Sequence, residues 1–242
     1  MRTTKRRHSY LSLAKLKFTM QEACPICLRP RDFCLCNQIV PIQHECTVVI
    51  LEHPQETRKW LNSAQLARYL LGCRVQVGLS WRNLETVVGE PAHPSEWGVL
   101  VLKSTHPQPQ PITIRAPHGE PLKEQPFLRG IIALDGNWQQ AKTLWWRNPW
   151  LTKCMTIELN PDFESQRQQI KSAALSTLEA VAFCVAHLEN RPEILDTAIQ
   201  EYRRWVVMPA KAALRLELQK AKTQSTEKMP LSPAGQNPTK EL

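Results

Sequence analysis

The stretch Gly130–Trp150, GIIALDGNWQQAKTLWWRNPW, determines how the rest of the chain is interpreted. Its first part, Ile131–Leu134, is a short apolar run that ends at Asp135-Gly136, which predicts a buried strand. Asn137 then precedes a polar, helix-favouring segment over residues 138–144. In α/β domains, ligands bind outside the carboxyl ends of strands, beside the loops and helix N-termini that follow. The stretch therefore predicts an α/β fold with a ligand site at Asp135.

The same letters also have a purely structural interpretation. Asp-Gly-Asn suits a turn, and Asp135 or Asn137 can serve only to cap the next helix. Two features favour a ligand: Trp138 stands at the helix start, where its ring can stack on a flat molecule, and later tryptophans alternate with cations, as in nucleic-acid binding by stacking. The alternating tryptophans and cations are Trp145, Trp146, Trp150, Lys142 and Arg147. One of the adjacent pair, Trp145 or Trp146, is expected to lie in the core.

Composition narrows the class of partner. The chain has 242 residues, enough for one sizeable core with appendages, and a formal net charge of +9. Such a basic balance indicates a polyanion, nucleic acid before membrane. No apolar run approaches the roughly 18 residues of a membrane span, and no apolar segment follows the basic N-terminus. We therefore expect a cytoplasmic protein with no membrane contact, and nothing in the pattern indicates an obligate protein partner.

Four cysteines in the N-terminal part have the spacing of a metal site. Cys24, Cys27, Cys34 and Cys36 follow the pattern C-x2-C, six residues, C-x-C. Four thiolates so close together fit a closed tetrahedral zinc site with a structural role. Disulfides and an iron–sulfur cluster are the alternatives. The other cysteines lie singly among apolar residues and are predicted to be core residues: Cys46, Cys73, Cys154 and Cys184.

Further periodic segments fill in an α/β pattern of a largely parallel sheet with flanking helices. Strands are predicted at 46–51, 73–79, 98–102 and 154–159, with a short edge strand at 112–114 inside a proline-rich excursion. Helices are predicted at 64–71, in a long segment that opens at 175–180, at 192–207 with a break at Pro209, and from there to about 222. The long helix is expected to have one apolar face, formed by Leu178, Val181, Ala182, Val185 and Leu188. The domain boundaries follow: a basic flexible arm at 1–21, the four-cysteine element at 22–45, a catalytic domain at 46–222 and a disordered tail at 223–242.

The loop after the first strand reads His53-Pro54-Gln55-Glu56. A histidine and a glutamate there suit metal or acid–base chemistry, although a plain polar loop is the alternative. Asn62 or Ser63 is placed to cap the helix that follows. Basic residues in this loop and helix are candidates for contact with RNA or form a solvated face: Arg58, Lys59 and Arg68.

Several of these motifs together resemble the DTW-domain family. Asp135-Gly136-Asn137-Trp138 is similar to its D-x-T/S-W signature, with Asn137 where Thr or Ser is usual. The His-Pro-x-Glu loop with Asn62-Ser63 resembles a second family motif, and Leu175–Ala180, LSTLEA, stands unchanged as a third. The cysteine cluster and the order of the motifs also agree with the family, over residues 23–190. The stretch after the third strand, Lys103-Ser104-Thr105, departs from the family pattern.

The resemblance implies a fold and a reaction. Family members resemble tRNA-uridine aminocarboxypropyltransferases and the SPOUT class, in which the C-terminal part of the chain forms a trefoil knot around the cofactor. The implied reaction moves the 3-amino-3-carboxypropyl group of S-adenosylmethionine to N3 of a uridine in tRNA and releases methylthioadenosine. Asp135 would be the general base or an orienting acceptor, and Trp138 would pack on the base or the cofactor.

The resemblance also implies binding residues. Those for S-adenosylmethionine are Lys103, Ser104, Leu134, Asp135, Gly136, Leu175, Ser176 and Thr177, and those for tRNA are Arg58, Lys59, Asn62, Arg68, Lys142 and Arg147. Ser176 and Glu179 have the spacing of a capping box, so these residues could serve only to cap a helix. Three other functions stay open: an aminocarboxypropyltransferase acting on ribosomal RNA, a SPOUT-like RNA methyltransferase, and a non-catalytic zinc-stabilised RNA-binding protein.

Overall fold

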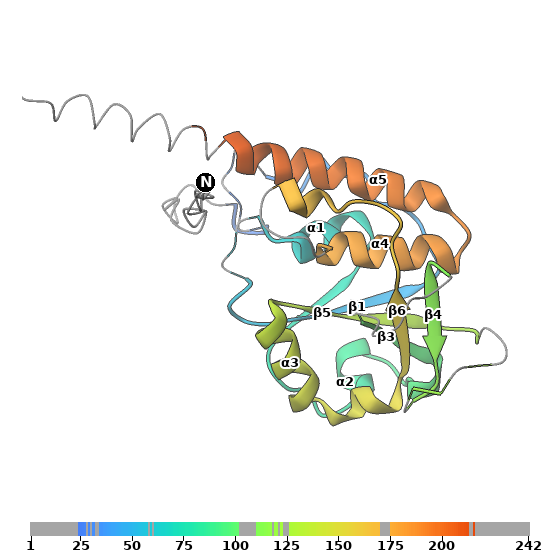
Figure 1. The fold of residues 1–242 in the computed structure, drawn as a ribbon. Helices are drawn as coiled ribbons and strands as arrows, with labels where there is room; N and C mark the ends of the chain where they lie inside the picture. Colours follow the sequence, from blue (N-terminus) through green and yellow to red (C-terminus); the bar gives the residue numbers. More distant parts are fainter. Residues whose placement is uncertain are drawn as a thin grey trace, which may run out of the picture.

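A mostly parallel six-stranded sheet forms the centre of the protein, with helices on both faces (Figure 1). The computed structural model describes residues 24–27, 29, 31, 34–57, 59, 61–101, 110–117, 119, 120, 122, 126–169, 175–212 and 215. The strands are β1 (Thr47–Glu52), β2 (Arg74–Val77), β3 (Trp97–Val101), β4 (Ile112–Arg115), β5 (Gly130–Asp135) and β6 (Met155–Leu159). Their order across the sheet is β2-β1-β5-β3-β6-β4, and β4 pairs antiparallel with β6 at the edge. The predicted α/β class and edge strand are confirmed.

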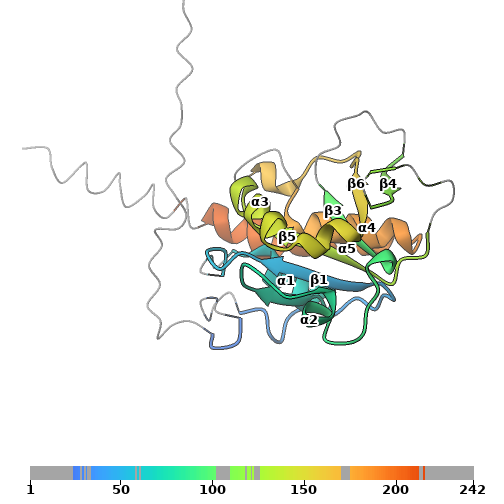
Figure 2. The same cartoon turned by 90° about the horizontal axis from the view of Figure 1, so that it is seen from below.

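The helices divide between the two faces of the sheet. They are α1 (Ser63–Leu70), α2 (Leu84–Val88), α3 (Trp138–Arg147), α4 (Thr177–Leu188) and α5 (Pro192–Tyr202). Short 3-10 turns are η4 (Pro94–Glu96), η5 (Pro149–Lys153) and η6 (Gln166–Gln169), and a π-helical turn, η7 (Arg203–Val207), follows α5. Helices α1, α4 and α5 lie on one face, and α2 and α3 lie on the other, which is turned toward the viewer in Figure 2.

Alternation along the central strands fills two separate cores. In β1, Val48 and Ile50 join the core under α1 and α4, while Val49 and Leu51 join the core over α2. Successive strand side chains point to opposite faces, so a strand buried on both sides must be apolar throughout. The same alternation places Asp135 of β5 and Glu52 of β1 on the α1 and α4 face, because each lies two residues beyond an apolar residue of that core. The last residues of both strands therefore bring carboxylates to one side of the sheet.

A glycine allows β5 to sit between β1 and β3. A Cβ atom on Gly130 would lie 2.6 Å from the carbonyl oxygen of Thr47 and 2.5 Å from the ring of Trp97. No other residue fits there without moving β1 or the fully buried indole. Gly130 is thus required for the close packing that puts the end of β5 next to the end of β1.

The connections after β1 and β5 leave the sheet in opposite directions. The chain passes from β1 to α1 on one face and on to β2, whereas from β5 it passes to α3 on the other face and on to β6. Such a topological switch point leaves a crevice outside the carboxyl ends of the two strands, where open α/β sheets bind their ligands. Glu52 and Asp135 are paired in register at this point.

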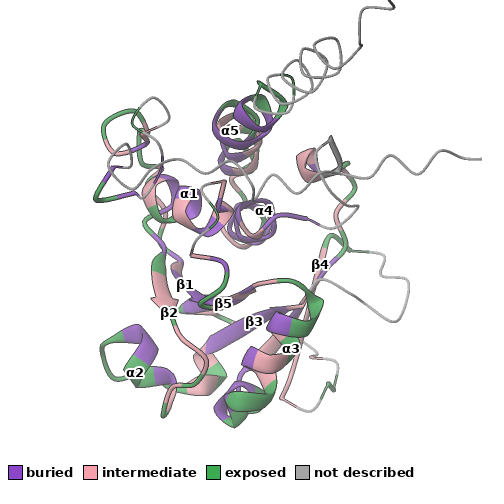
Figure 3. Ribbon diagram, turned by 90° about the vertical axis from the view of Figure 1, so that its left-hand side faces the viewer, coloured by how far each residue is buried: buried purple, intermediate pink, exposed green. Residues whose placement is uncertain are grey.

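Helix α4 is buried along almost its whole length, as its colouring in Figure 3 shows. Residues 178–186 are all buried, because the sheet, α1 and α5 surround the helix. A helix that is apolar all round belongs in a core rather than at a surface. The sequence pattern predicted one apolar face for this helix, and the second contact, with α5, explains why both sides are buried.

The predicted helix break at Pro209 is wrong. Helical structure continues through residues 208–212 after η7. Proline has no N–H for the carbonyl four residues earlier, which is that of Trp205. The guanidinium of Arg29 donates to this carbonyl at 2.8 Å, so the group that Pro209 leaves unpaired is satisfied from the N-terminal element.

Several predictions concern parts of the chain outside the described residues. These are the basic arm at 1–21, the tail at 223–242, the end of the last helix beyond 215, and the segments 102–109 and 170–174. The knot and the domain boundaries stay predictions. Among the described residues, no helix combines the length and the apolar character that crossing a membrane requires.

Candidate functional site

Asp135, the last residue of β5, lies at the centre of the site. It is 7% exposed, and its carboxylate accepts a hydrogen bond from the hydroxyl of Thr177, the first residue of α4. Burial raises the pKa of Asp135 to about 6; the hydrogen bond from Thr177 opposes this rise, the Glu56 carboxylate strengthens it, and Arg167 and Lys59 oppose it. A carboxyl group with a pKa near neutrality is suited to accept a proton at physiological pH.

The hydrogen bond from Thr177 to Asp135 joins two segments that lie 42 residues apart in the chain. Ser176 caps α4 and forms a capping box with Glu179, as the sequence pattern allowed. Thr177 takes no part in that box, because its hydroxyl is directed to Asp135 instead. The LSTLEA stretch therefore has two tasks: Ser176 and Glu179 begin the helix, and Thr177 orients the carboxylate.

Glu179 also fixes the loop in front of α4. Its fully buried carboxylate accepts hydrogen bonds from the backbone N–H of Ser176 at 2.7 Å, the Ser165 hydroxyl at 2.8 Å and the backbone N–H of Gln166 at 2.6 Å. Arg167 donates to the carbonyl of Leu175 at 3.3 Å. These bonds hold the described residues before and after the 170–174 segment against the start of α4.

Glu52 is a second buried carboxylate beside Asp135. It is fully buried at the end of β1, and its Oε1 accepts a hydrogen bond from the Asn62 amide at 2.8 Å. Burial raises the pKa of Glu52 to about 7; the charge of Asp135 adds to this rise, and the Asn62 hydrogen bond opposes it. Two like charges in a dry site cannot both ionise without cost, so this pair favours holding a proton.

Asn62 connects the second carboxylate to the start of α1. Its Oδ1 caps the helix by accepting from the N–H groups of Ala64 and Gln65, at 2.7 and 3.4 Å. Its Nδ2 donates to Glu52 and to the carbonyl of Glu56, at 2.8 and 3.2 Å. The residue is 7% exposed and all its hydrogen-bonding groups are used within the protein. Its side chain therefore positions Glu52 and the start of α1, and the predicted contact of Asn62 with RNA stays a prediction.

Glu56, in the loop after β1, is the third buried carboxylate. One of its oxygens pairs with Lys59, whose side chain is half exposed. Its other oxygen and Oε2 of Glu52 are buried without a hydrogen-bond partner among the described residues. Buried carboxylate oxygens normally have partners, so this arrangement suits a cationic ligand or a retained proton.

The start of α3 is built rigidly around Asp135. Asn137 caps α3 and forms a capping box with Gln140, in which the Gln140 side chain accepts from the Asn137 N–H at 2.6 Å. A Cβ atom on Gly136 would lie 2.7 Å from Cβ of Gln140, so a glycine is needed for this tight turn. Gln140 also donates to Gln55 at 3.0 Å and so ties α3 to the loop after β1. Asn137 performs the capping that a threonine or serine would also provide.

The structure distributes the other predicted ligand-binding residues over several surfaces. Leu175 and Ser176 are buried at the start of α4, and Leu134 faces away from Asp135 toward the core over α2. Trp138 is 75% exposed at the start of α3, and the cations Lys59, Arg68, Lys142 and Arg147 are exposed. Of the two adjacent tryptophans, Trp145 packs against the core and Trp146 is 69% exposed, as the sequence led us to expect. Arg58, Lys103 and Ser104 lie outside the described residues.

The four N-terminal cysteines come together as predicted. All four Sγ atoms lie within 4.8 Å of one another, with Cys24–Cys36 at 3.8 Å and Cys27–Cys34 at 3.9 Å. A tetrahedral ion with metal–sulfur bonds of about 2.3 Å places its ligands about 3.8 Å apart, so the cluster fits a metal. All four are free thiols in the structure. The remaining cysteines are buried core residues, as predicted.

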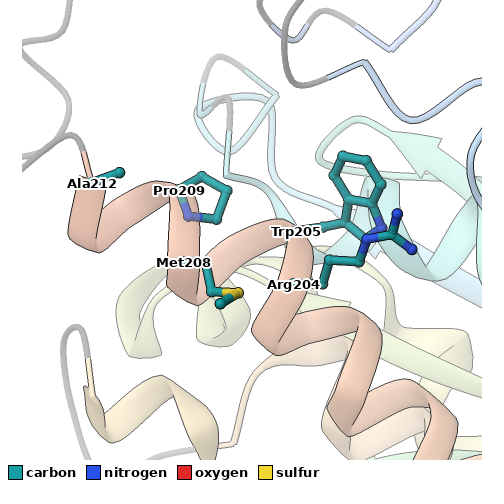
Figure 4. A pocket seen from close by; sticks show the side chains of 5 residues that line it. All are labelled: Arg204, Trp205, Met208, Pro209 and Ala212. Carbon is teal, nitrogen blue, oxygen red and sulfur yellow. The ribbon is translucent and has the colours of Figure 1, made fainter.

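A shallow depression of about 310 Å³ lies at the C-terminal end of η7 (Figure 4). Its lining is mostly apolar, and the guanidinium of Arg204 lies over the ring of Trp205 at 4.9 Å. The lining residues are Arg204, Trp205, Met208, Pro209 and Ala212. No residue of the carboxylate cluster lines it, so we treat it as separate from the site around Asp135.

The sequence did not single out Glu52, and for Glu56 it left open acid–base or metal chemistry and a plain polar loop. An acidic residue directly after a run of four apolar residues was the available signal for Glu52, since a strand buried on both faces rarely ends in an unpaired charge. The pairing of β1 with β5, which sets Glu52 beside Asp135, has no signature in the local sequence.

These features define the class as an α/β protein with a cluster of buried carboxylates at the switch point of a mostly parallel sheet. The DTW domain model matches residues 21–229, and the chain belongs to that family.

Curated relatives carry a more specific name. The chain is 28% identical over 186 residues to tRNA-uridine aminocarboxypropyltransferase 2 of Drosophila melanogaster, over 73% of this chain and 70% of that protein. It is 27% identical to the proteins of the same name from Macaca fascicularis and Mus musculus, over 73% of this chain and 60% of each relative. No solved structure matches the chain.

Proposed function

We propose that this protein transfers the 3-amino-3-carboxypropyl group of S-adenosylmethionine to N3 of a uridine in tRNA and releases methylthioadenosine. Membership of the DTW family and the names of the relatives support this reaction class. The observation that carries the proposal is the hydrogen bond between Thr177 and Asp135, because it joins two family motifs at the switch point of the sheet.

Asp135 has the properties that the proton transfer needs. N3–H of uridine is weakly acidic, so a carboxylate held at hydrogen-bonding distance assists its loss. In the proposed step, the N3 proton moves to Asp135, N3 bonds to the carbon next to sulfur, and the carbon–sulfur bond breaks with its electron pair going to sulfur. Thr177 fixes the direction of the carboxylate, which matters because correct alignment of the reacting atoms supplies much of such a rate.

The carboxylate cluster suits the charge of the proposed co-substrate. S-adenosylmethionine carries a sulfonium and an ammonium group, and Asp135, Glu52 and Glu56 form a buried acidic cluster in which two oxygens have no partner among the described residues. The residues that we propose to hold the co-substrate come from β5, the turn after it, the start of α4 and the segment after β3. They are Leu134, Gly136, Leu175, Ser176, Thr177, Lys103 and Ser104. A SPOUT-like knot that encloses it forms part of the proposal.

For tRNA, we propose contacts from the exposed cations Lys59, Arg68, Lys142 and Arg147, together with Arg58. Trp138, exposed next to Asp135, would pack against the uridine or the co-substrate. A target uridine must be unpaired to present N3, which favours a loop. The four-cysteine cluster would hold a structural zinc ion, because four thiolates leave no open position for chemistry.

The test combines purified protein, unmodified tRNA and S-adenosylmethionine, followed by mass spectrometry of the nucleosides. The proposal requires a uridine that is heavier by an aminocarboxypropyl group, together with one methylthioadenosine per transfer. A methyl-sized gain would move the protein to the methyltransferases, and a product on ribosomal RNA alone would change the substrate. If the protein binds RNA but transfers no group, the remaining function is that of a non-catalytic, zinc-stabilised RNA-binding protein.

A further inference from the structure

The outward face of α3 carries an exposed row of aromatic and basic side chains. Trp138, Lys142 and Trp146 are spaced four residues apart, so they lie on one side of the helix. Trp138 is 75% exposed, Trp146 is 69% exposed, and Lys142 is also exposed. At a rise of about 1.5 Å per residue, the two indoles lie roughly 12 Å apart along the helix axis. We call these three residues the α3 ridge.

The ridge is not a part of the core that remained uncovered. The inner side of α3 is already packed, with Gln140 8% exposed, Leu144 fully buried and Trp145 against the core over α2. Figure 3 shows exposed, intermediate and buried stretches following one another along the ribbon of α3. Single exposed apolar residues are ordinary, but two indoles in register on one helix form a patch of the kind that binds a partner.

Charge favours an RNA over a protein as that partner. Helix α3 contains no acidic residue, Lys142 separates the two indoles, and exposed Arg147 ends the helix. Indole rings stack on bases of any sequence, and a lysine between them can contact the phosphate that links those bases. An apolar protein partner would gain nothing from the lysine at the centre of the patch. The chain's net charge of +9 also favours a polyanion.

The position of the ridge connects it to the site. It begins at Trp138, three residues after Asp135, and runs away from the carboxylate cluster along the helix. We propose that the α3 ridge is a stacking surface for the unpaired nucleotides of the target loop, with Trp138 next to the target uridine and Trp146 stacked on a nucleotide that flanks it. This inference rests on the proposed function for the identity of the RNA, but the surface itself can be tested without any transfer reaction.

The test measures the affinity of unmodified tRNA by fluorescence anisotropy for Trp146→Ala and Lys142→Ala. We expect Trp146→Ala to weaken binding about fivefold or more, since stacking on one indole contributes about 1–3 kcal/mol per base. We expect Lys142→Ala to reduce the slope of log affinity against log salt by about one, as loss of one phosphate contact does. A single-stranded oligonucleotide should compete with tRNA, and a duplex of equal length should not.

The matched control is Phe127→Ala, which removes an aromatic ring that is 83% exposed before β5, at the opposite end of that strand. It should bind tRNA within about twofold of the unchanged protein. Thermal unfolding and S-adenosylmethionine binding should be the same in all variants, which shows that the fold and the site are intact.

Two results would contradict the proposal that the α3 ridge binds unpaired nucleotides. One is tRNA binding by Trp146→Ala equal to that of the Phe127→Ala control. The other is a dimer in sedimentation that Trp146→Ala dissociates, because a second copy would then cover the ridge. If tRNA binding depends on the ridge but no transfer occurs, the proposed function is wrong and the ridge proposal stands. If transfer occurs but tRNA binding does not depend on the ridge, the ridge proposal is wrong and the proposed function stands.

Discussion

At the scale of single residues, the proton affinity of Asp135 depends on opposing neighbours. Burial and the Glu56 carboxylate raise its pKa, whereas the Thr177 hydroxyl, Arg167 and Lys59 lower it. Glu56 and Lys59 come from the loop after β1, Arg167 from η6 and Thr177 from α4, so the local sequence around Asp135 contains none of this information. What the sequence does predict is the presence of a carboxylate at the end of a buried strand, and that prediction is confirmed.

The first prediction concerns the pH dependence of transfer. If Asp135 accepts the proton, kcat/KM should rise with pH through about 6, the pKa to which burial raises this residue. Glu56→Gln removes a like charge and should move this acid limb to lower pH. Thr177→Val removes a hydrogen bond to the ionised form and should move it to higher pH. If the acid limb moves in the same direction in both variants, or moves in neither, another group controls the pH dependence of kcat/KM.

The second prediction concerns stability. Because the pKa of Asp135 is raised from 3.8 to about 6 on folding, the folded state binds more protons than the unfolded state between these values. Stability contributed by this residue therefore falls as pH rises through that window. Asp135→Asn should raise the free energy of unfolding at pH 8 by up to roughly 3 kcal/mol, at about 1.36 kcal/mol per pKa unit. The gain should shrink toward pH 4.

Urea unfolding of both proteins at pH 8 and near pH 4 measures this difference. The amide keeps an acceptor for Thr177, so the variant tests the charge and not the hydrogen bond. A variant that is less stable at pH 8 would mean that the carboxylate is stabilised in the fold by contacts stronger than its desolvation.

At the scale of elements, Asn62 links a helix cap to the carboxylate cluster. We predict that Asn62→Ala lowers the free energy of unfolding by about 2–4 kcal/mol, because it removes the α1 cap and the partner of buried Glu52 together. Asn83→Ala is the matched control: Asn83 caps α2 through the N–H of Thr86 and serves no buried carboxylate. Asn83→Ala should lower the free energy of unfolding by about 1 kcal/mol. Equal losses in chemical denaturation would mean that Glu52 does not depend on Asn62.

The elements themselves were largely predictable. Apolar runs bounded by turn residues located β1, β3, β5 and β6, and the capping box of Ser176 and Glu179 located the start of α4. Pro209 misled because a proline normally ends a helix. The carbonyl that it leaves unpaired is satisfied by Arg29, which lies 176 residues from Trp205 in the chain. No local pattern can indicate such a partner.

At the scale of the whole molecule, the four-cysteine element is joined to the C-terminal helix. Leu35 is fully buried in the core under α4, and Arg29, 1% exposed, donates to the Trp205 carbonyl in η7. Cys36 Sγ also lies 3.7 Å from the hydroxyl of Tyr69 on α1. Order in the cysteine loop should therefore be transmitted to α1 and η7.

The fourth prediction follows from these contacts. The purified protein should hold about one zinc ion per chain, as a four-thiolate site implies. Chelation should lower the thermal midpoint and increase hydrogen exchange in the peptide over residues 203–208, because Arg29 loses its fixed position. Exchange in α2, on the opposite face of the sheet, is the internal control and should stay unchanged. Loss of the metal with no change at 203–208 would contradict the link.

The order of the strands in the sheet could not be predicted from the sequence. Alternating strands and helices predict a mostly parallel sheet, but the insertion of β5 between β1 and β3 depends on which long connection the chain makes. That insertion sets Asp135 beside Glu52 and allows α4 to place Thr177 against it. The resemblance of motifs indicated that Asp135 and Thr177 belong to one site, and the sheet order gives the physical reason.

The most direct measurement is the single-turnover rate of transfer by Asp135→Asn, at saturating S-adenosylmethionine and tRNA. Loss of a positioned general base typically costs about 10²–10⁴ in rate. We predict a decrease of at least about 100-fold, with tRNA bound as tightly as by the unchanged protein; saturation removes the effect of any weaker S-adenosylmethionine binding from the measured rate. A rate within about threefold of the unchanged protein would contradict the role of Asp135 and with it the central claim.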